Sequence, residues 1–495
     1  MNLLINARWL VVAISLATPL SSWPQSPGPW QRVPNTTLRM PPSIADPTAG
    51  PLPPTLADTG AFSDLIHLTP QAGIVPYDLN VPFWSDGAHK FRWFSLPDTN
   101  LTVGFEREAN WSFPTGMVWI KHFELELTNG VPTSARRIET RFLVRTTDGI
   151  YGVTYRWDDS QTNATLVTEE GIPDEDLYIQ DQGETHTQAW HYPSRSECLR
   201  CHSQIAGWGL GFNTPQLNRE FNYGGVTNNQ IAALNQAGYF SSNVTGIHYL
   251  RALAPTTNTA WSLEYRVRSY LAANCAQCHQ PGTDCLARWD ARITTPTAAA
   301  GIINGRLIFP FAADPNGRVI VPGSLTHSTM VQRLANLGSS HMPPLATTVV
   351  NAEAVNLLSE WITNGLADYQ SYADWQLAFF GSTNLPSAAP YGDPDGDGAS
   401  NQLEYLVGGN PMLGGDAWRI SLQSGASSVQ IHFPHLANRC YEVQWSTNLS
   451  DAKSWVVLDQ LDNRPFFSST NGRAVIEDAS AGSSAKFYRV RIFGP

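Results

Sequence analysis

The chain has 495 residues, of which 42% are hydrophobic and 15% are charged, and its formal net charge is −11. This length exceeds what one core can organise and predicts roughly two to four domains, while the composition excludes an intrinsically disordered chain. The negative charge excludes an electrostatic nucleic-acid-binding surface and disfavours an anionic membrane, whereas a basic partner protein stays compatible with it.

The N-terminus has the pattern of a secretory signal peptide. Arg8 precedes an apolar run over residues 9–20, and small residues follow that run, which is the order of regions in such peptides. The run is shorter than the about 20 residues that a bilayer-spanning helix needs. We therefore expect residues 1–22 to be removed on export, and the remaining chain to be periplasmic, secreted or on the cell surface without spanning the membrane.

The next two segments differ in their periodicity. Residues 23–58 are rich in proline, serine and threonine without any period, which predicts a linker or a strap over a neighbouring domain. Residues 59–190 repeatedly alternate apolar and polar side chains, as in MVWIKHFELEL at 117–127. This period of two, with turn signals between the runs, predicts an antiparallel β-sandwich.

Helical patterns appear in the middle of the chain. Residues 191–258 contain a cysteine motif and a glycine-rich loop, GWGLGF, which lacks the strand–helix context of a dinucleotide site. Residues 259–368 contain three apolar-periodic runs, and Ser262 and Asn351 are the expected N-caps of the first and last. Gly365 is the expected C-cap of the last helix. Three helices predict a compact α-helical domain.

Four of the six cysteines lie in two copies of the pattern C-x-x-C-H. The copies consist of Cys198, Cys201 and His202, and of Cys275, Cys278 and His279. Haem c attachment requires two thiols that reach the two vinyl groups of the porphyrin and an adjacent histidine that binds the iron, and this spacing supplies them. The pattern therefore predicts two covalently bound haem c groups, and export agrees with attachment outside the cytoplasm.

Other roles for these cysteines stay open. A redox-active C-x-x-C opens a helix in a thioredoxin-like βαβ context, which the sequence here does not show. Two C-x-x-C pairs can bind structural zinc, and an exported chain can form disulfides. The separation of 77 residues and the histidine at the same place in both copies favour haem. Cys285 and Cys440 remain, either as a disulfide or as free thiols.

The sequence indicates a sixth iron ligand more clearly for the second motif than for the first. Met342, in HMPPL at 341–345, precedes the last predicted helix and would give the second haem His/Met ligation, which raises the reduction potential. The other interpretation is that Met342 packs in the hydrophobic core and does not bind iron. For the first haem the preferred candidates are His191 and Met117, with His122 and His186 as further ones, or its sixth position is open.

Over roughly residues 58–366 the chain resembles a family of exported bacterial dihaem c-type cytochromes. The resemblance rests on ordered matches that include PYDLNVPFWSDGAHKFRW (76–93), WHYPSRSECLRCH (190–202), RSYLAANCAQCHQPG (268–282) and MPPL (342–345). Relatives occur beside, or fused to, quinoprotein sugar dehydrogenases, so the resemblance implies such an enzyme as electron donor. Cys285 departs from the family pattern.

The C-terminal third lies outside that resemblance. Residues 369–415 form a linker that contains DPDGDGASNQLE at 393–404, which resembles calcium loops of the thrombospondin type 3 or dockerin kind. The expected calcium ligands are Asp393, Asp395, Asp397, Ala399 through its carbonyl, Asn401 and Glu404. A solvated acidic turn is the other interpretation. Residues 416–495 return to strand patterns and resemble terminal β modules of exported bacterial proteins.

The expected fold class is multidomain α+β: an N-terminal antiparallel β-sandwich, an α-helical class I-like cytochrome c domain and a small C-terminal β-sandwich. The expected function is single-electron transfer, with electrons accepted from a periplasmic dehydrogenase. Two other hypotheses stay open. One is a dihaem peroxidase with an open first haem, and the other is a haem-bearing module that binds polysaccharide.

Overall fold

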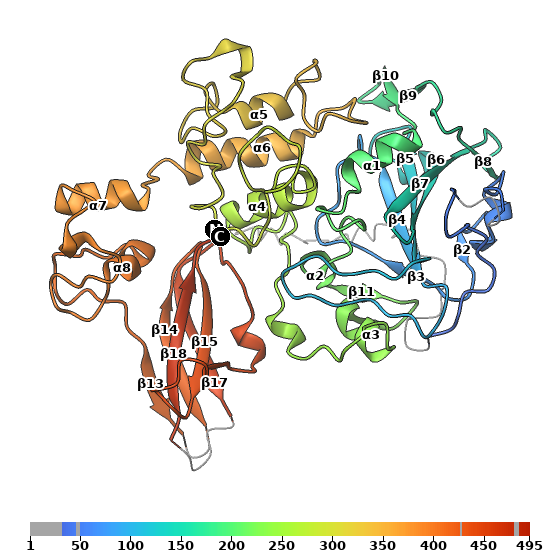
Figure 1. Ribbon diagram of the computed structural model, residues 1–495. Coiled ribbons are helices and arrows are strands. Elements are labelled where there is room, and N and C mark those ends of the chain that lie inside the picture. Colours follow the sequence, from blue (N-terminus) through green and yellow to red (C-terminus); the bar gives the residue numbers. More distant parts are fainter. Residues whose placement is uncertain (1–31, 46–49, 426–427, 480–484) are drawn as a thin grey trace, which may run out of the picture.

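The computed structural model describes residues 32–45, 50–425, 428–479 and 485–495. The predicted signal peptide and the start of the predicted linker lie outside these residues. Figure 1 shows a large β-rich part, a helical part beside it, further helices farther out and a C-terminal β part. In the part of the chain that is described, no helix is both long and apolar enough to cross a bilayer.

A six-stranded antiparallel sheet forms the centre of the N-terminal part, and its strands lie in sequence order. The strands are β3 (Ile74–Tyr77), β4 (His89–Ser95), β5 (Val118–Glu126), β6 (Ala135–Arg145), β7 (Ile150–Trp157) and β8 (Ala164–Leu166). Successive side chains point to opposite faces. Trp119 and Leu143 belong to the core on one face, and Ile120 and Val144 belong to the core on the other. Both faces of the sheet are therefore buried.

Different segments cover the two faces. Helices α2 (Thr214–Leu217) and α3 (Gln230–Gln236) contribute Leu217 and Ile231 to one core. On the other face, Leu38, Leu52 and Leu56 pack as a strap, and the Tyr155 hydroxyl donates a hydrogen bond of 3.0 Å to the carbonyl of Pro53. Three two-stranded ladders surround the sheet: β1 (Phe62–Asp64) with β2 (Thr69–Pro70), β9 (Glu175–Asp181) with β10 (Glu184–Trp190), and β11 (Glu220–Asn222) with β12 (Thr227–Asn229).

The predicted β-sandwich over residues 59–190 is therefore wrong. One sheet carries both cores, and its covering layers are the strap on one face and helices with loops on the other. Alternation of apolar and polar residues shows that a strand has two unlike faces, but it does not show what packs on each face.

Three helices surround a second core in the middle of the chain. They are α4 (Leu263–Asn274), α5 (Thr329–Leu334) and α6 (Ala352–Glu360). Ser262 and Asn351 cap α4 and α6 through side-chain oxygens that accept backbone N–H groups, which confirms both predicted N-caps. Gly365 is not a C-cap, because α6 runs into a π-helical turn over Trp361–Gly365 whose cap is Leu366.

The predicted fold class is wrong in its central element. The described structure is multidomain and rich in strands, and an α-helical cytochrome c domain is not evident in it. Between α4 and α5 the chain runs from residue 275 to 328 mostly as loops, and these loops supply Trp289, Ile302 and Ile320 to the core. Frequent glycine and proline in that segment prevent long helices, so loop side chains fill the space.

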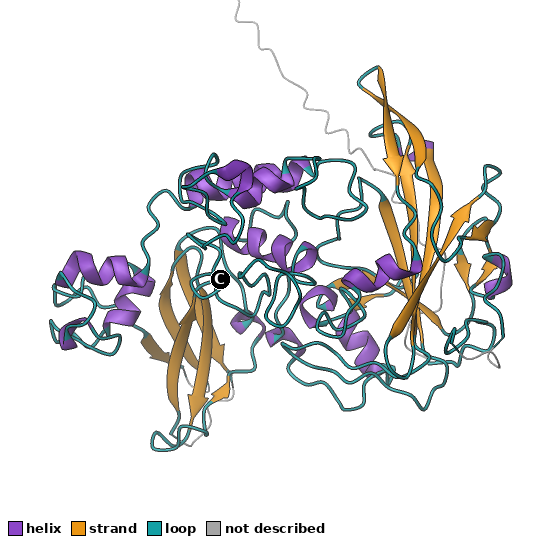
Figure 2. Ribbon diagram, turned by 45° about the horizontal axis from the view of Figure 1, so that its top comes forward, coloured by secondary structure: helices purple, strands orange, loops and turns teal. Residues whose placement is uncertain are grey.

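The C-terminal part begins with two helices, α7 (Tyr372–Phe380) and α8 (Asn401–Val407), at the left of Figure 1. Two three-stranded antiparallel sheets then share one core. Their strands are β13 (Ser421–Ser424), β14 (Val429–His435) and β17 (Gly472–Asp478), and β16 (Val456–Val457), β15 (Cys440–Ser446) and β18 (Phe487–Phe493). Figure 2 shows them apart from the N-terminal sheet.

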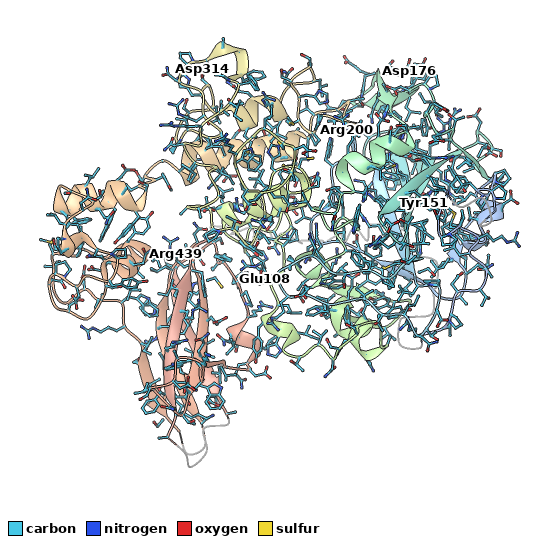
Figure 3. All side chains as sticks on the ribbon, in the orientation of Figure 1. Glu108, Tyr151, Asp176, Arg200, Asp314 and Arg439 are labelled. Atoms are coloured by element: carbon cyan, nitrogen blue, oxygen red, sulfur yellow. The ribbon has the colours of Figure 1, made fainter. Side chains whose placement is uncertain are left out.

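This C-terminal β part is docked on the base of α4. The backbone N–H of Ser262 donates to the carbonyl of Phe467 at 2.8 Å, and that of Thr297 donates to the carbonyl of Pro495 at 2.7 Å. The Phe467 ring stacks on Tyr265 with ring centroids 4.4 Å apart. Figure 3 labels Arg439 at the end of the β part that lies nearest to these helices. The two parts therefore share a packed interface.

Candidate haem-attachment and calcium sites

Helix α1 (Arg195–Cys201) carries the first motif. Ser194 and Glu197 form a capping box that begins the helix, and His202 is its C-cap residue. The helix lies close against strand β7 at Gly152, where an added Cβ would be 2.7 Å from Cys198 Sγ. Only glycine leaves room for this sulfur. Figure 3 labels Arg200 on this helix, between the sheet and the three helices.

The His202 ring is oriented by a glycine-rich loop. Its Nδ1 lies 2.7 Å from the carbonyl oxygen of Trp208, so Nδ1–H is the donor and Nε2 keeps its lone pair. Gly209 lets the loop approach the sheet, because a Cβ there would lie 2.6 Å from the Trp119 ring. Burial and the Lys121 ammonium lower the pKa of His202 to about 4. The imidazole is therefore neutral, which is the form that binds iron.

The first motif lies on the wall of a cavity, here called the first cavity. Its wall includes Trp119, Lys121, Arg141, Cys198, Cys201 and His202. Two buried indole N–H groups in this wall, those of Trp119 and Trp190, have no hydrogen-bond acceptor among the described residues. Two cations and two free donors suit a ligand that has carboxylates and an extended apolar ring, as a porphyrin has.

Lys121 and Arg141 were missed by sequence reasoning. They lie on neighbouring strands, β5 and β6, and are directly paired in the ladder. Arg141 forms a two-pronged ion pair with Glu139, whereas Lys121 has no salt-bridge partner among the described residues. Burial, with Arg92 and Arg141 nearby, lowers the pKa of Lys121 to about 7. The two paired cations therefore differ in their partners, which only the spatial neighbours reveal.

Of the preferred sixth ligands of the first haem, the structure brings His191 to the wall of the first cavity, where its ring is held by other groups. Both nitrogens of His191 contact carboxylates: Nδ1 lies 2.8 Å from Asp174 Oδ1, and Nε2 lies 3.1 Å from Glu197 Oε2. Met117 is fully buried in the core of the sheet and does not line the first cavity. His122 is likewise held, with Nδ1 at 2.8 Å from the hydroxyl of Thr140.

The second motif follows directly from α4 and opens on a second cavity. The wall of this second cavity includes Cys275, His279, Phe309, Met330 and Met342 and is mostly apolar. The structure thus brings Met342 to the cavity of His279, as the sequence predicts. Met330, on α5, lines the same cavity and is a second methionine that the sequence did not indicate as an iron ligand. Cys278 is not on this wall and lies instead beside Cys201.

The His279 ring is held differently from that of His202. It stacks on Trp289 with ring centroids 4.2 Å apart, and Cys285 Sγ lies 3.6 Å from its Nδ1. Burial and the Arg333 cation lower the pKa of His279 to about 4, so this imidazole is also neutral. Cys285 therefore belongs to the second site although the family pattern does not require it.

The surroundings of the second cavity fit a large apolar group. Leu286, Ile308 and Phe309 line it and are 62%, 43% and 65% exposed, which is unusual for three neighbouring large apolar side chains. A planar porphyrin attached beside them would cover apolar surface of this kind. The Cys275 thiol, the His279 imidazole and the Met342 thioether in one apolar cavity supply most of the groups that hold haem c, while Cys278 lies outside this wall.

The alternative of a zinc site receives no support. Among the described residues, the groups of three or more His, Cys, Asp or Glu ligands close enough to share an ion are acidic, so the motif cysteines do not converge on a zinc site. All six cysteines are free thiols. Cys285 lines the second cavity, whereas Cys440 is buried in the interface below α4, so the predicted alternative of a disulfide between them is not formed here.

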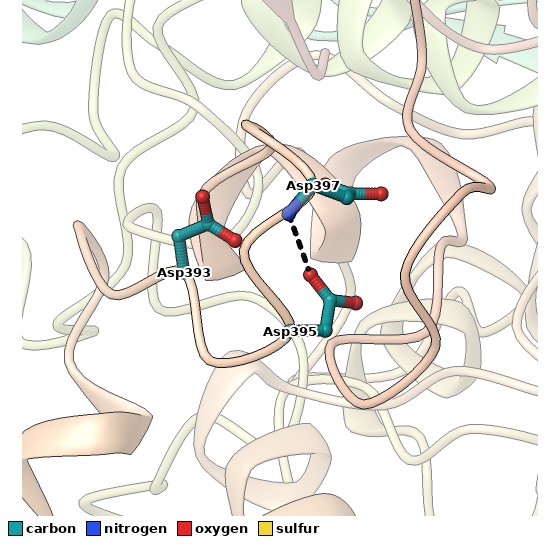
Figure 4. A group of neighbouring side chains, drawn as sticks. All are labelled: Asp393, Asp395 and Asp397. Atoms are coloured by element: carbon teal, nitrogen blue, oxygen red, sulfur yellow. Dashed lines mark hydrogen bonds between the residues drawn. The ribbon is translucent and has the colours of Figure 1, made fainter.

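A separate acidic site lies on the 393–404 loop. One carboxylate oxygen from each of Asp393, Asp395 and Asp397 lies within 4.8 Å of the others. Figure 4 shows the three side chains on the loop, with the Asp397 N–H donating to Asp395 Oδ1 at 3.2 Å. A second group, equally close, joins Asp395 to Glu404 and Asp416. Asp416 lies beyond the predicted loop and was missed.

Glu404 supplies the observation that points to a cation. It is 1% exposed, and neither carboxylate oxygen has a hydrogen-bond partner among the described residues. Burial and the neighbouring aspartates, Asp395 foremost, raise its pKa to about 7. A buried, unpartnered carboxylate beside four aspartates is costly without a cation. All the ligands are oxygens, which suits Ca²⁺.

The remaining predicted calcium ligands are placed less directly. The Asn401 amide donates to the carbonyls of Ser387 and Ala389, both at 2.7 Å, so its nitrogen braces the preceding turn. Its Oδ1 is buried and has no partner among the described residues. Ala399 is buried, and its N–H donates to Asp397 Oδ1 at 2.9 Å, which fixes that carboxylate.

Comparisons of the chain with family models, curated proteins and solved structures found no match. The resemblance to exported dihaem cytochromes therefore stays a prediction from the sequence, and the functional conclusion depends on the geometry of the two cavities.

Proposed function

We propose that the chain is an exported dihaem c-type protein that transfers single electrons between partner proteins. The observation that supports this most strongly is the pair of cavities. Each C-x-x-C-H motif places its neutral histidine and at least one of its cysteines on the wall of its own cavity. Met342 also lines the second cavity.

Haem c would supply a reversible one-electron couple at its iron. The protein residues do the rest. The motif cysteines are the attachment points, and the hydrogen bond from His202 to Trp208 keeps Nε2 available. In the second cavity the stacked Trp289 positions the His279 ring, and the apolar wall excludes water. An apolar wall and a methionine sulfur both favour the ferrous state and raise the reduction potential.

A periplasmic dehydrogenase is the proposed electron donor, and a quinoprotein sugar dehydrogenase is the class that the sequence resemblance implies. The formal charge of −11 suits a partner with a basic docking face. The calcium site is proposed as structural, because its ligands join α8 to residue 416, where the C-terminal β part begins.

A second candidate function is supported by the first cavity. Among the described residues no methionine lines it, and the His191 nitrogens are both engaged. Iron held by His202 would then keep an open position, which a peroxidase needs. Such an enzyme would reduce hydrogen peroxide to two waters with two electrons and two protons, the electrons coming one at a time from a donor protein.

Expression of the full chain in a host that attaches haem c tests both functions. We expect two haems per chain to stay bound after acidified acetone extraction. Colourless protein, or complete release of the pigment, would refute both. Two low-spin haems that do not react with peroxide would support the carrier, and a high-spin haem that is oxidised rapidly by peroxide would support the peroxidase instead.

A further inference from the structure

The two cavities share a wall built from two short segments. In the first segment, Asn274 and Gln277 line the first cavity while Cys275 and His279 line the second. The second segment divides in the same way. Met342 lines the second cavity, and the residues after it line the first: Pro343, Leu345, Ala346 and Thr347. A few residues of backbone therefore separate the two candidate haem sites.

The two motifs also touch each other directly. The Cys201 and Cys278 thiols are neighbours, and their interaction lowers the pKa of Cys201 and raises that of Cys278. Next to them, Ile205 Cδ1 lies 3.5 Å from the position that a Cβ on Gly282 would take. Cys201 and Cys278, the second cysteines of the two motifs, thus face each other.

A hydrogen-bonded lock holds this shared wall against the sheet. The buried Asp86 carboxylate accepts the backbone N–H groups of Thr348 and Val349 at 3.0 and 3.1 Å, and the Thr348 hydroxyl at 2.9 Å. The Trp84 indole donates to the carbonyl of Val349 at 3.0 Å, and its backbone N–H donates to Asn274 Oδ1 at 2.7 Å. Both segments of the wall are therefore tied to one loop, 84–86.

We propose that Cys201 and Cys278 are the facing attachment sulfurs of a closely spaced haem pair, and that the Asp86 lock sets the spacing, so that electrons pass directly between the two sites. This inference depends on the proposed function. Haem held by Cys201 and His202 at one site and by Cys278 and His279 at the other would supply two one-electron couples, and one electron would pass between them with no bond formed or broken and no proton moved. A one-electron donor protein supplies the electron and a one-electron acceptor protein removes it.

Electron paramagnetic resonance of the oxidised full chain tests the spacing. Two single-haem variants are the references: Cys198→Ser with Cys201→Ser, and Cys275→Ser with Cys278→Ser. We expect the spectrum and relaxation of the dihaem protein to differ from the sum of the two references, because two close iron spins interact. A spectrum equal to that sum would overturn the inference, while two bound haems would leave the proposed function standing.

The lock is tested by the rate of electron transfer between the haems after rapid photoreduction. Asp86→Asn and the milder Thr348→Val should slow it several-fold, because the rate of electron transfer falls as the two haems move apart. Thr363→Val, which removes a hydroxyl bond to the Ser359 carbonyl at the end of α6, is the matched control and should change nothing. Equal rates in all variants would contradict the role of the lock.

A low haem content would give the contact between Cys201 and Cys278 a different meaning. If the exported chain contains fewer than two haems, the proposed function fails. Peptide mapping of the same material then identifies the bond at the motifs. A disulfide between Cys201 and Cys278 would make their contact a structural cross-link and would overturn the relay as well.

Discussion

The two cavities differ in what surrounds the histidine. The first is built on the sheet and has two cations, Lys121 and Arg141, and no methionine among its described residues. The second is built from helices and loops, is mostly apolar and contains Met330 and Met342. Because charge and axial ligand both tune a haem, one repeated sequence motif produces two unlike sites. In the proposed function, the motif would supply the attachment points and the surrounding fold would set the redox behaviour.

Removing one motif at a time should have the largest effect. The Cys198→Ser with Cys201→Ser variant and the Cys275→Ser with Cys278→Ser variant should each lose one of two covalent haems, measured as haem per chain. Each remaining haem should keep the spectrum of its own cavity. Cys440→Ser, which removes a buried thiol outside both cavities, is the control. Loss of both haems in a folded single-motif variant would contradict independent sites.

Replacing Met342 should have the next largest effect. Met342→Ala should lower the potential of the second haem by on the order of 100 mV, since axial ligands spread haem potentials over about 0.8 V. Potentiometric titration with separate assignment of the two haems measures it. The first haem should keep its potential. Met330→Leu is the matched control. If Met330→Leu lowers the potential of the second haem and Met342→Ala does not, the sixth ligand is Met330 on α5.

Calcium removal should affect stability and leave both cavities unchanged, because the acidic site lies on the α7–α8 part (Figure 1). Without calcium, Glu404 has a raised pKa of about 7 in the folded chain, against 4.5 for the ordinary group. Folded protein then binds more protons between these values, so stability should fall as pH rises from about 4.5 to 7, by roughly 2 kcal/mol.

With calcium bound, the dependence should reverse, since the ion requires the ionised carboxylate and competes with the proton. Thermal unfolding with chelator and with calcium, at several pH values, measures both slopes. Glu404→Gln should flatten both, and Asp416→Asn should weaken calcium binding, whereas Asp462→Asn, outside the acidic site, should do neither. A melting temperature that calcium does not change at any pH would contradict the site.

Lys121 should have the smallest effect, confined to the first haem. Its positive charge disfavours ferric iron, so Lys121→Gln should lower that potential by roughly 40 mV, which corresponds to about 1 kcal/mol for one electron. Since the pKa of Lys121 is about 7, the same potential should fall as pH rises through that value. Lys121→Arg should retain the higher potential and lose the pH dependence. A matching shift at the second haem would mean that the cation is not local to the first cavity.

Local signals in the sequence predicted local features well. The caps Ser262 and Asn351 begin α4 and α6 as expected, because a side-chain oxygen next to free N–H groups acts within one turn. Met342 lines the cavity of His279, and three aspartates converge on one loop. In each of these cases the pattern and the contact lie within the same short segment or domain.

Predictions that depended on packing between distant segments were wrong, and some features that depend on such packing were not predicted at all. The β-sandwich became one sheet covered by a strap, and the helical cytochrome domain became short helices joined by core-filling loops. Met117 looked like a free ligand in the sequence but is fully buried in the core. Asp416 and the GWGLGF loop had no recognised motif, since their roles come from what lies beside them.

The two C-x-x-C-H motifs, their neighbouring residues and the acidic loop can be recognised in the sequence, because each is a matter of residue type and short spacing. Folding alone brings Cys201 beside Cys278, places Lys121 on the first cavity and ties the shared wall to the sheet through Asp86. Such contacts join segments far apart in the chain. Their free energy depends on how whole elements pack, which no short pattern contains.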